Sequence, residues 1–478
     1  MCPSARRIGR GEVTAPRPAF QRYAIPTDPA PDVVRVPPRF RVKVTKYRLA
    51  ALAIGEVIHA RGNMRVALSR PCMYGVFGRP VGGMAPIEDL CVACLRCTVE
   101  YPRVVRIVRN PARELLAVPG ISADEVETLL YESRTGRVPV RGAGYRGPFG
   151  GSGWDGMWLD MSEIVRPTRD GIHGREHIST VVDIGERPPF LAFDAAGAPV
   201  GPLPRGRAIS VPFLLGPAPA DERADEVQDV LLEAARHLDT LALVPLPTIL
   251  ERGLAGPHVA PLVGAGDLSL LDRLPAPPVV VEIDGWDPIH HAAIAARFPD
   301  AILSVRVPLG SDAVALVRAG ARVIHLVAPD WAAAAVSLPD DIRRTHLALV
   351  EAGVRDEVTL LGSGAVRVAE HVPKAIACGL DAVVLDVPLW VALQGRRRED
   401  PGAAGASAAV SWAFPRAGEE WAVRRVLNVA ASWRDQLIEI LGAMGLREVR
   451  RLRGELGRCM FQVDVEREAL GGIDGYPA

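Results

Sequence analysis

The second half of the chain alternates short apolar runs with amphipathic stretches. The stretches carry apolar residues at the three- and four-residue spacing of a helix, whereas the runs lack polar alternation, which is typical of parallel strands buried on both faces. The apolar runs lie at residues 209–215, 241–244, 259–263, 279–283, 302–307, 323–327, 358–361 and 382–385. Eight strands alternating with helices predict an α/β fold and favour a closed (β/α)8 TIM-type barrel over an open sheet.

The pattern along the whole chain divides it into five units. The first is rich in Pro and Arg with little periodicity, which predicts an extended N-terminal arm. The second combines an amphipathic helix with a small ferredoxin-like cysteine module, and the third is a glycine-rich connection that leads into the barrel. The fourth is the barrel itself, and the fifth is a helical C-terminal segment. The boundaries are 1–41, 42–140, 141–206, 207–400 and 401–478.

Composition narrows the class of protein. The chain has 478 residues, of which 49% are hydrophobic and 23% charged, as in a soluble globular protein. The formal net charge is zero, so no global field attracts nucleic acid or an anionic membrane. No apolar run approaches the length of a membrane span, and the first residues lack the apolar core of a signal peptide. We therefore expect a cytoplasmic protein.

Three of the seven cysteines lie within seven residues, which indicates a metal site rather than a disulfide framework. Cys91, Cys94 and Cys97 follow the C-x-x-C spacing that surrounds a compact inorganic core, and the run resembles the bacterial ferredoxin cluster motif. Tyr101 stands where that motif has its fourth cysteine. The fourth ligand is then Cys72, or the site has three ligands only. Zinc, which normally takes four N or S ligands, and no metal at all are the alternatives to an iron–sulfur cluster.

A glycine turn stands between the seventh predicted strand and the helix after it. Its residues are Gly362, Ser363 and Gly364. Backbone N–H groups at such a turn, together with the helix N-terminus, can face an anion, and the loops after strands seven and eight of a (β/α)8 barrel often build a phosphate site. The alternative is a tight turn that needs glycine and binds nothing.

The segment from Leu361 to Val383 resembles the strand-seven segment of the FMN-binding domain of glutamate synthases, which usually shows a Ser-Gly-Gly-Ile-Arg-Thr-like run there. The cysteine run is similar to the ferredoxin-like insertion of archaeal-type glutamate synthase large chains. The resemblance covers about residues 70–450. It implies FMN at the carboxyl ends of the strands, with its phosphate at the glycine turn. It also implies that Arg306, at the end of strand five, lies near where the family has a Lys facing the flavin and the keto acid.

The sequence departs from that family at several points. Ala328-Pro-Asp-Trp331 replaces the Gly-Gly-Thr-Gly run after strand six, and Val387-Pro-Leu-Trp390 replaces the glycine contact after strand eight. The three cysteines that follow the barrel in the family are replaced by a run that includes Arg396 and Arg397. The chain also shows no N-terminal glutaminase domain with a Cys nucleophile. Ammonia from glutamine would then come from another subunit.

Three hypotheses follow. The first is a glutamate synthase-like oxidoreductase that uses FMN and an iron–sulfur cluster to reduce an imine formed from 2-oxoglutarate and ammonia. It would act in an oligomer with an electron-donating or glutaminase subunit. The second is a flavin-free barrel that serves as a structural or electron-transfer subunit of a larger complex. The third is a lyase or isomerase that uses Glu282 and Asp284, because carboxylates two residues apart on a strand point to the same side.

Overall fold

The computed structural model describes most of the chain outside the N-terminal part of the arm and several loops. The described residues are 24–68, 72–78, 85–118, 120–139, 150–162, 177–187, 191–201, 203–219, 223–328, 331–398 and 411–475, without the side chains of 67–68, 331–336, 398 and 411. Most of the predicted arm and most of the glycine-rich run at 142–153 lie outside the described residues. No described helix is long and apolar enough to cross a lipid bilayer.

Eight parallel strands close into a barrel, as the apolar runs predicted. The barrel strands are β8 (Phe213–Leu215), β9 (Ala242–Pro245), β10 (Val259–Val263), β11 (Val280–Asp284), β12 (Ile302–Pro308), β13 (Val323–Val327), β14 (Thr359–Ser363) and β15 (Ala382–Leu385). Each strand pairs with the next along the chain, and β15 pairs with β8. The strands are short and almost wholly apolar, so their outer faces bury against the surrounding helices.

The predicted first strand, 209–215, is wrong in its extent. Its first residue ends β7 (Gly206–Ile209), which pairs antiparallel with β4 (Val182–Gly185) outside the barrel. The barrel strand begins only at Phe213. Pro212 stands between the two strands, and since proline has no N–H to donate, a continuous ladder cannot run through it.

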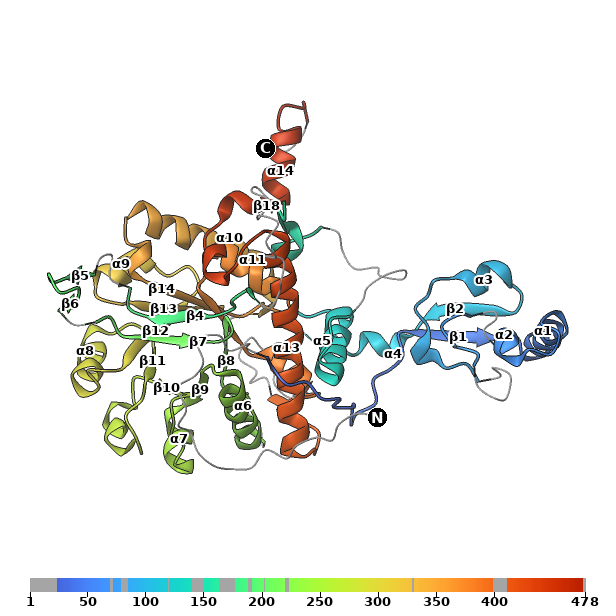
Figure 1. Cartoon of the computed structure of the whole chain (residues 1–478), viewed down its shortest axis with the longest axis horizontal. Coiled ribbons are helices and arrows are strands. Elements are labelled where there is room, and N and C mark those ends of the chain that lie inside the picture. The colour runs from blue at the N-terminus through green and yellow to red at the C-terminus, as the bar shows by residue number, and fades with distance from the viewer. Residues whose placement is uncertain are drawn as a thin grey trace.

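Helices surround the barrel, and Figure 1 shows them on its outside. They are α6 (Ala224–Leu238), α7 (Leu246–Arg252), α8 (Pro288–Arg297), α9 (Ala313–Arg318), α10 (Trp331–Glu351), α11 (His371–Cys378) and α12 (Val387–Ala392). The predicted C-terminal helix is α13 (Glu419–Ala443), which packs against both α6 and α5 (Ala123–Thr135). Three two-stranded sheets and the last helix complete this part: β3 (Met157–Leu159) with β18 (Cys459–Phe461), β5 (Ala192–Phe193) with β6 (Pro199–Val200), β16 (Arg396–Arg398) with β17 (Ser411–Ala413), and α14 (Gln462–Leu470).

One buried guanidinium joins three separate segments to α13. Arg425 is fully buried and donates to the carbonyl oxygens of Ala30 and Ala392, to the Asp32 carboxylate at 2.9 Å and to the Ser133 hydroxyl at 2.6 Å. These partners belong to the described end of the arm, to α12 and to α5. Because the donors of Arg425 are spread over these segments, the arm is held against the barrel helices rather than left in solvent.

The cysteine module is a separate small unit. It contains β1 (Phe40–Val44), α1 (Lys46–His59), α2 (Met64–Leu68), η1 (Glu88–Leu90), α3 (Arg96–Glu100) and β2 (Val105–Arg109), with β1 and β2 antiparallel. It has its own apolar cluster, which includes Leu49, Phe77 and Val105. Figure 1 shows it standing apart from the barrel, joined to it through α4 (Pro111–Glu114) and α5. The cysteines therefore belong to a part of the chain that packs around its own core, outside the barrel.

Candidate functional site

Four cysteines of the module line one small cavity. Cys72 and Cys97 are buried, Cys91 is partly buried and Cys94 is exposed at the surface. The turn that carries Cys72 is brought against the Cys91–Cys97 loop by packing of Val76 and Phe77 in the core of the module. The structure therefore places Cys72 with the other three cysteines, where the sequence offered it as one of two possibilities.

The backbone between these cysteines adopts an unusual conformation. Ala93 and Leu95 have φ angles of +51° and +62°, although neither is glycine. Left-handed residues alternating with right-handed ones turn successive N–H groups toward one side, which is the concave shape that binds anions and iron–sulfur clusters. The N–H of Ala93 already points at the Cys91 sulfur. Such strain costs about 1–3 kcal/mol per residue and persists where the loop has a function to serve.

Two of the four thiols, those of Cys91 and Cys97, have a raised pKa. Burial raises the pKa of Cys97 to about 11, and the neighbouring thiols of Cys72, Cys91 and Cys94 raise it further. Burial also raises the pKa of Cys91, while the N–H of Ala93 opposes that shift. The thiols of Cys91 and Cys97 would become thiolates beside a cationic core, so loading a metal would release protons.

The four thiols are not drawn together around one point as they are in a loaded metal site. Among the described residues, no group of three or more His, Cys, Asp or Glu side chains could hold one metal ion. A tetrahedral zinc with Zn–S bonds of about 2.3 Å would bring its sulfurs to within about 3.8 Å of one another. Four cysteines around one cavity is the number of thiol ligands found both in structural zinc sites and in iron–sulfur sites.

A second group of polar residues lies inside the barrel. Val281, Ile283 and Leu303 pack outward against the helices, so the alternating residues on the same strands face inward. These inward residues are Glu282 and Asp284 on β11, and Ser304 and Arg306 on β12, with His325 of β13 in register with Arg306.

Glu282 and His325 form a buried pair at the centre of this group. The Nδ1 atom of His325 lies 2.9 Å from Oε1 of Glu282, and the Ser304 hydroxyl donates to Oε2 at 3.3 Å. The side chains of Glu282 and His325 are only 1% and 2% exposed. The sequence singled out Glu282 but missed His325, although an imidazole in the middle of the apolar run 323–327 was the available signal.

Arg306 and Asp284 lie nearer to solvent than this pair. Arg306 is partly buried and Asp284 is exposed. They are Cα partners in the β11–β12 register, yet neither takes part in an ion pair or side-chain hydrogen bond within the described part of the chain. Partly exposed Leu262 and Val327 adjoin them at the carboxyl ends of their strands. This part of the barrel mouth is therefore open, with a cation that is free to meet an anion.

The glycine turn after β14 is, by contrast, sealed by the protein's own side chains. Gly362, Ser363 and Gly364 are all buried. A Cβ on Gly362 would lie 2.5 Å from the side chain of Leu380, and one on Gly364 would lie 2.6 Å from that of Ala328. Packing and a φ of +86° therefore require glycine at 364, whereas a side chain at 362 would have to displace the end of Leu380.

Trp154 covers the same turn from outside the barrel. Its indole N–H donates to the carbonyl oxygen of Ala365 at 3.0 Å, and its ring stacks on His371. Among the described residues nothing accepts a hydrogen bond from the N–H of Gly364 or Ala365, both of which have positive φ. The turn thus retains two N–H groups that an anion could use, but the entrance is covered.

The N-terminus of the helix after β15 is capped by a carboxylate of the chain itself. The side chain of Asp386 accepts a hydrogen bond from the N–H of Val387 at 2.7 Å and caps α12. Pro388, in the first turn, has no N–H. A phosphate at this end of the helix would meet a negative charge, so the β15 side does not fit the phosphate of FMN, and the N–H groups of the covered β14 turn are the donors that remain.

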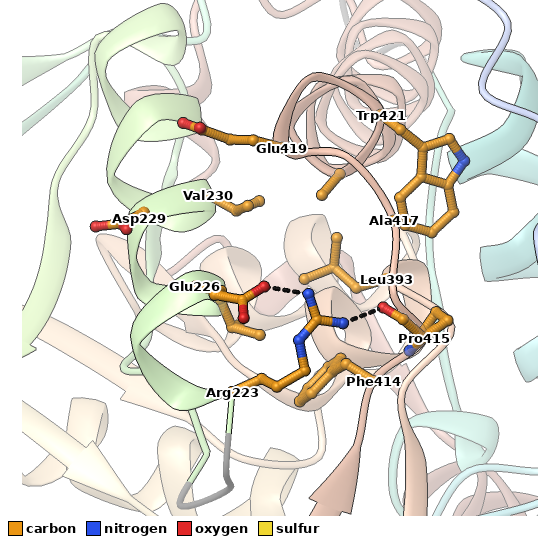
Figure 2. Close-up of a pocket in the computed structure, with 12 residues that line it drawn as sticks. Arg223, Glu226, Asp229, Val230, Leu393, Phe414, Pro415, Ala417, Glu419 and Trp421 are labelled. Atoms are coloured by element: carbon orange, nitrogen blue, oxygen red, sulfur yellow. Dashed lines mark hydrogen bonds and ion pairs between the residues drawn. The ribbon is translucent and has the colours of Figure 1, made fainter.

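A further cavity lies in the outer layer between α6 and α13 (Figure 2). Arg223 reaches into it, pairs with Glu226 and donates to the carbonyl oxygen of Pro415. Phe414 and Trp421 form apolar walls. Since its arginine is already paired, this cavity offers no free cation comparable with Arg306.

Comparison with known proteins identifies distant relatives. No family model matches the chain. The chain is 23% identical over 435 residues to the archaeal-type glutamate synthase [NADPH] of Dehalococcoides mccartyi, covering 76% of this chain and 85% of that protein. It is 35% identical over 114 residues to the archaeal glutamate synthase [NADPH] of Methanocaldococcus jannaschii, covering 23% and 22% of the two chains. Among solved structures, a mandelate oxidase variant with (S)-mandelic acid matches at a TM-score of 0.43 and 18% identity, over 64% of this chain and 90% of that one.

Proposed function

We propose that this chain, a divergent relative of the archaeal-type glutamate synthases, is an oxidoreductase that carries an iron–sulfur cluster on Cys72, Cys91, Cys94 and Cys97. Its reaction would be the reduction of an imine formed from 2-oxoglutarate and ammonia at the open part of the barrel mouth. The observation that carries this proposal is the convergence of four thiols on a strained loop, in a chain similar to a glutamate synthase over 76% of its length.

The residues of the barrel mouth have separate roles in this proposal. Arg306 would bind the carboxylate of the keto acid and stabilise negative charge that develops beside it. FMN, when bound, would supply the hydride chemistry. The flavin ring of FMN would lie at the open mouth around Arg306. The phosphate of FMN would find N–H donors at the covered turn Gly362–Gly364 and would face the Asp386 carboxylate on the other side. Ammonia would come from a separate glutaminase subunit.

Asp386→Asn should strengthen FMN binding about tenfold, because the variant removes a negative charge from the phosphate end while asparagine still caps the helix. FMN fluorescence quenching measures the affinity. Asp312→Asn, which alters the cap of α9 in the same way, is the control and should leave the affinity for FMN unchanged. Equal affinities of the wild type and Asp386→Asn would argue against a phosphate at this place.

The absorption spectrum of the purified protein, with iron and flavin assays, tests the proposed function. Iron together with flavin supports the oxidoreductase. Iron without flavin supports the second hypothesis, a flavin-free electron-transfer subunit, which the covered turn and the Asp386 cap favour. Protein with neither group contradicts both.

The cysteine module would meet its electron-donating partner through a basic surface. Residues 39–110 contain 13 Arg and Lys side chains but only four Asp and Glu, in a chain of zero net charge. Lys43 and Arg106 are exposed and lie directly opposite each other on β1 and β2, an arrangement of like charges that destabilises a sheet. Cys94 is exposed in the same module. An acidic electron carrier would relieve this repulsion and approach the cysteines.

The double variant Lys43→Glu, Arg106→Glu should slow electron transfer from a plant-type ferredoxin, used as the acidic probe, by about 10–100-fold at low salt. The difference should shrink as ionic strength rises. Arg273→Glu, Arg318→Glu makes the same charge change on the exposed barrel surface and should leave the rate unchanged. A rate that falls equally in both double variants would indicate a general charge effect, not a docking surface.

A further inference from the structure

The Glu282–His325 pair is out of place in the interior of a barrel. Layers of inward side chains in (β/α)8 barrels are dominated by bulky apolar residues. Here one of those layers contains a carboxylate and an imidazole, from two strands that flank β12, with hardly any exposure. Burying such groups costs free energy unless each polar atom is satisfied, so the pair calls for a reason beyond packing.

Hydrogen bonds orient the pair and leave one nitrogen free. Glu282 accepts from Ser304 and from Nδ1 of His325, which uses both carboxylate oxygens and fixes the imidazole. Within the described residues, the buried Nε2 of His325 has no partner. An unsatisfied buried atom of this kind costs about 1–3 kcal/mol. An imidazole held at Nδ1 by a carboxylate, with Nε2 free, is the arrangement of a proton donor or acceptor.

The register connects this nitrogen with the open mouth. Arg306 and His325 are Cα partners on adjacent strands and face the same side of the sheet. On β12, Arg306 lies two residues nearer to the carboxyl end of the strand than Ser304. Arg306 is partly exposed and has no partner among the described residues, and Asp284 stands beyond it at the rim. The register therefore places side by side, on three adjacent strands, an exposed carboxylate, a partly exposed cation and a buried, oriented imidazole.

We propose that the barrel mouth is a proton-coupled binding site for a small α-oxo or α-imino acid, in which Arg306 binds the carboxylate and His325 takes up a proton on Nε2. The substrate class rests on the proposed function, whereas the coupling rests on the Glu282–His325–Arg306 arrangement alone. The proton comes from solvent on binding and stays on Nε2, which then donates a hydrogen bond to the oxo oxygen or the imino nitrogen of the ligand. No electrons move in this step.

The direction of the coupling follows from the charges. In the protein without ligand, the Arg306 guanidinium on β12 and the Glu282 carboxylate on β11 are the charged groups beside His325. Asp284 is exposed and acts weakly across solvent, and the neighbouring Leu361 of β14 is apolar. A bound carboxylate offsets the charge of Arg306, so the balance shifts toward the imidazolium and the protein gains a proton.

Calorimetric titration with 2-oxoglutarate, in buffers of equal pH near neutrality but different ionisation enthalpy, measures this proton uptake directly. The wild type should take up a fraction of a proton per ligand bound. His325→Gln should bind 2-oxoglutarate without buffer dependence, and Arg306→Gln should lose binding. His237→Gln, an exposed histidine on α6, is the matched control and should behave as the wild type.

Buffer dependence that persists in His325→Gln, or wild-type binding without any proton uptake, would overturn the inference, as would wild-type protein that does not bind 2-oxoglutarate. If His325→Gln does not fold, the ¹⁵N resonance of His325 Nε2 in the wild type replaces it. This resonance should move toward the protonated position when 2-oxoglutarate is added, and an unmoved resonance counts against the site. None of these measurements needs flavin, iron or turnover, so a failure to form glutamate would count against the proposed function alone.

Discussion

Asp381→Asn is expected to destabilise the barrel by about 3–5 kcal/mol, the cost of breaking a buried charge network by removing one partner. Asp381, just before β15, is 2% exposed and pairs with Arg355 at 3.0 Å, Arg187 at 2.7 Å and Arg453 at 3.2 Å. It also accepts the backbone N–H of Leu360 at 2.8 Å. The variant would leave three guanidinium groups around a neutral amide. Urea unfolding measures the loss.

The same network predicts how stability depends on pH. Burial by itself would raise the pKa of Asp381, but the guanidinium groups of Arg355, Arg187 and Arg453 outweigh it and hold that pKa below its ordinary value. The carboxylate therefore stabilises the fold fully above its unfolded pKa of about 3.9, and this contribution is lost as pH falls through the lower folded pKa. Unfolding curves of Asp381→Asn should lack this loss.

Asp356→Asn is the control for this prediction. Asp356 also pairs with Arg453, at 3.1 Å, but its side chain is 84% exposed. An exposed ion pair contributes at most about 1 kcal/mol. If both variants lost the same small amount of stability, the buried network would be no more than a set of surface contacts.

The barrel was predictable because its signal is local. Each strand is a short apolar run, and the order of runs and helices is enough to indicate eight parallel strands. The predicted strand 209–215 was wrong because β7 ends and β8 begins on either side of Pro212, and the two strands have different partners. Val211 and Phe213 are both apolar, so the sequence shows one continuous run there. Hydrophobicity reports burial, but not which neighbour provides it.

The candidate site was only partly predictable because its contacts are remote in sequence. The cysteine spacing pointed to one loop, but the position of Cys72 depends on the packing of the module core. The Glu282–His325 pair joins residues 43 positions apart, and Trp154 reaches Ala365 across 211 positions. Closure of the barrel and docking of the arm decide these contacts, and no local pattern encodes either. The glycines of the β14 turn show the same limit, since close packing and anion binding require the same residue type.

Cys72→Ser is expected to reduce the iron content of the purified protein by at least about tenfold and to remove its visible absorbance. Serine keeps the size of the side chain but does not provide the thiolate that iron–sulfur clusters require. Cys72 also lies in the core of the module, within the same cavity as Cys91 and Cys97. Iron analysis and the absorption spectrum after anaerobic reconstitution measure the effect.

Cys459→Ser is the matched control, because Cys459 is a free cysteine on β18, in a sheet outside the cysteine module. It should retain iron at the wild-type level. Full iron in Cys72→Ser, together with loss in Cys94→Ser, would mean a three-ligand core and would remove Cys72 from the site. Full iron in both variants would mean that the metal is held elsewhere. Loss in both, with Cys459→Ser unchanged, would place Cys72 and Cys94 together among the ligands of one core.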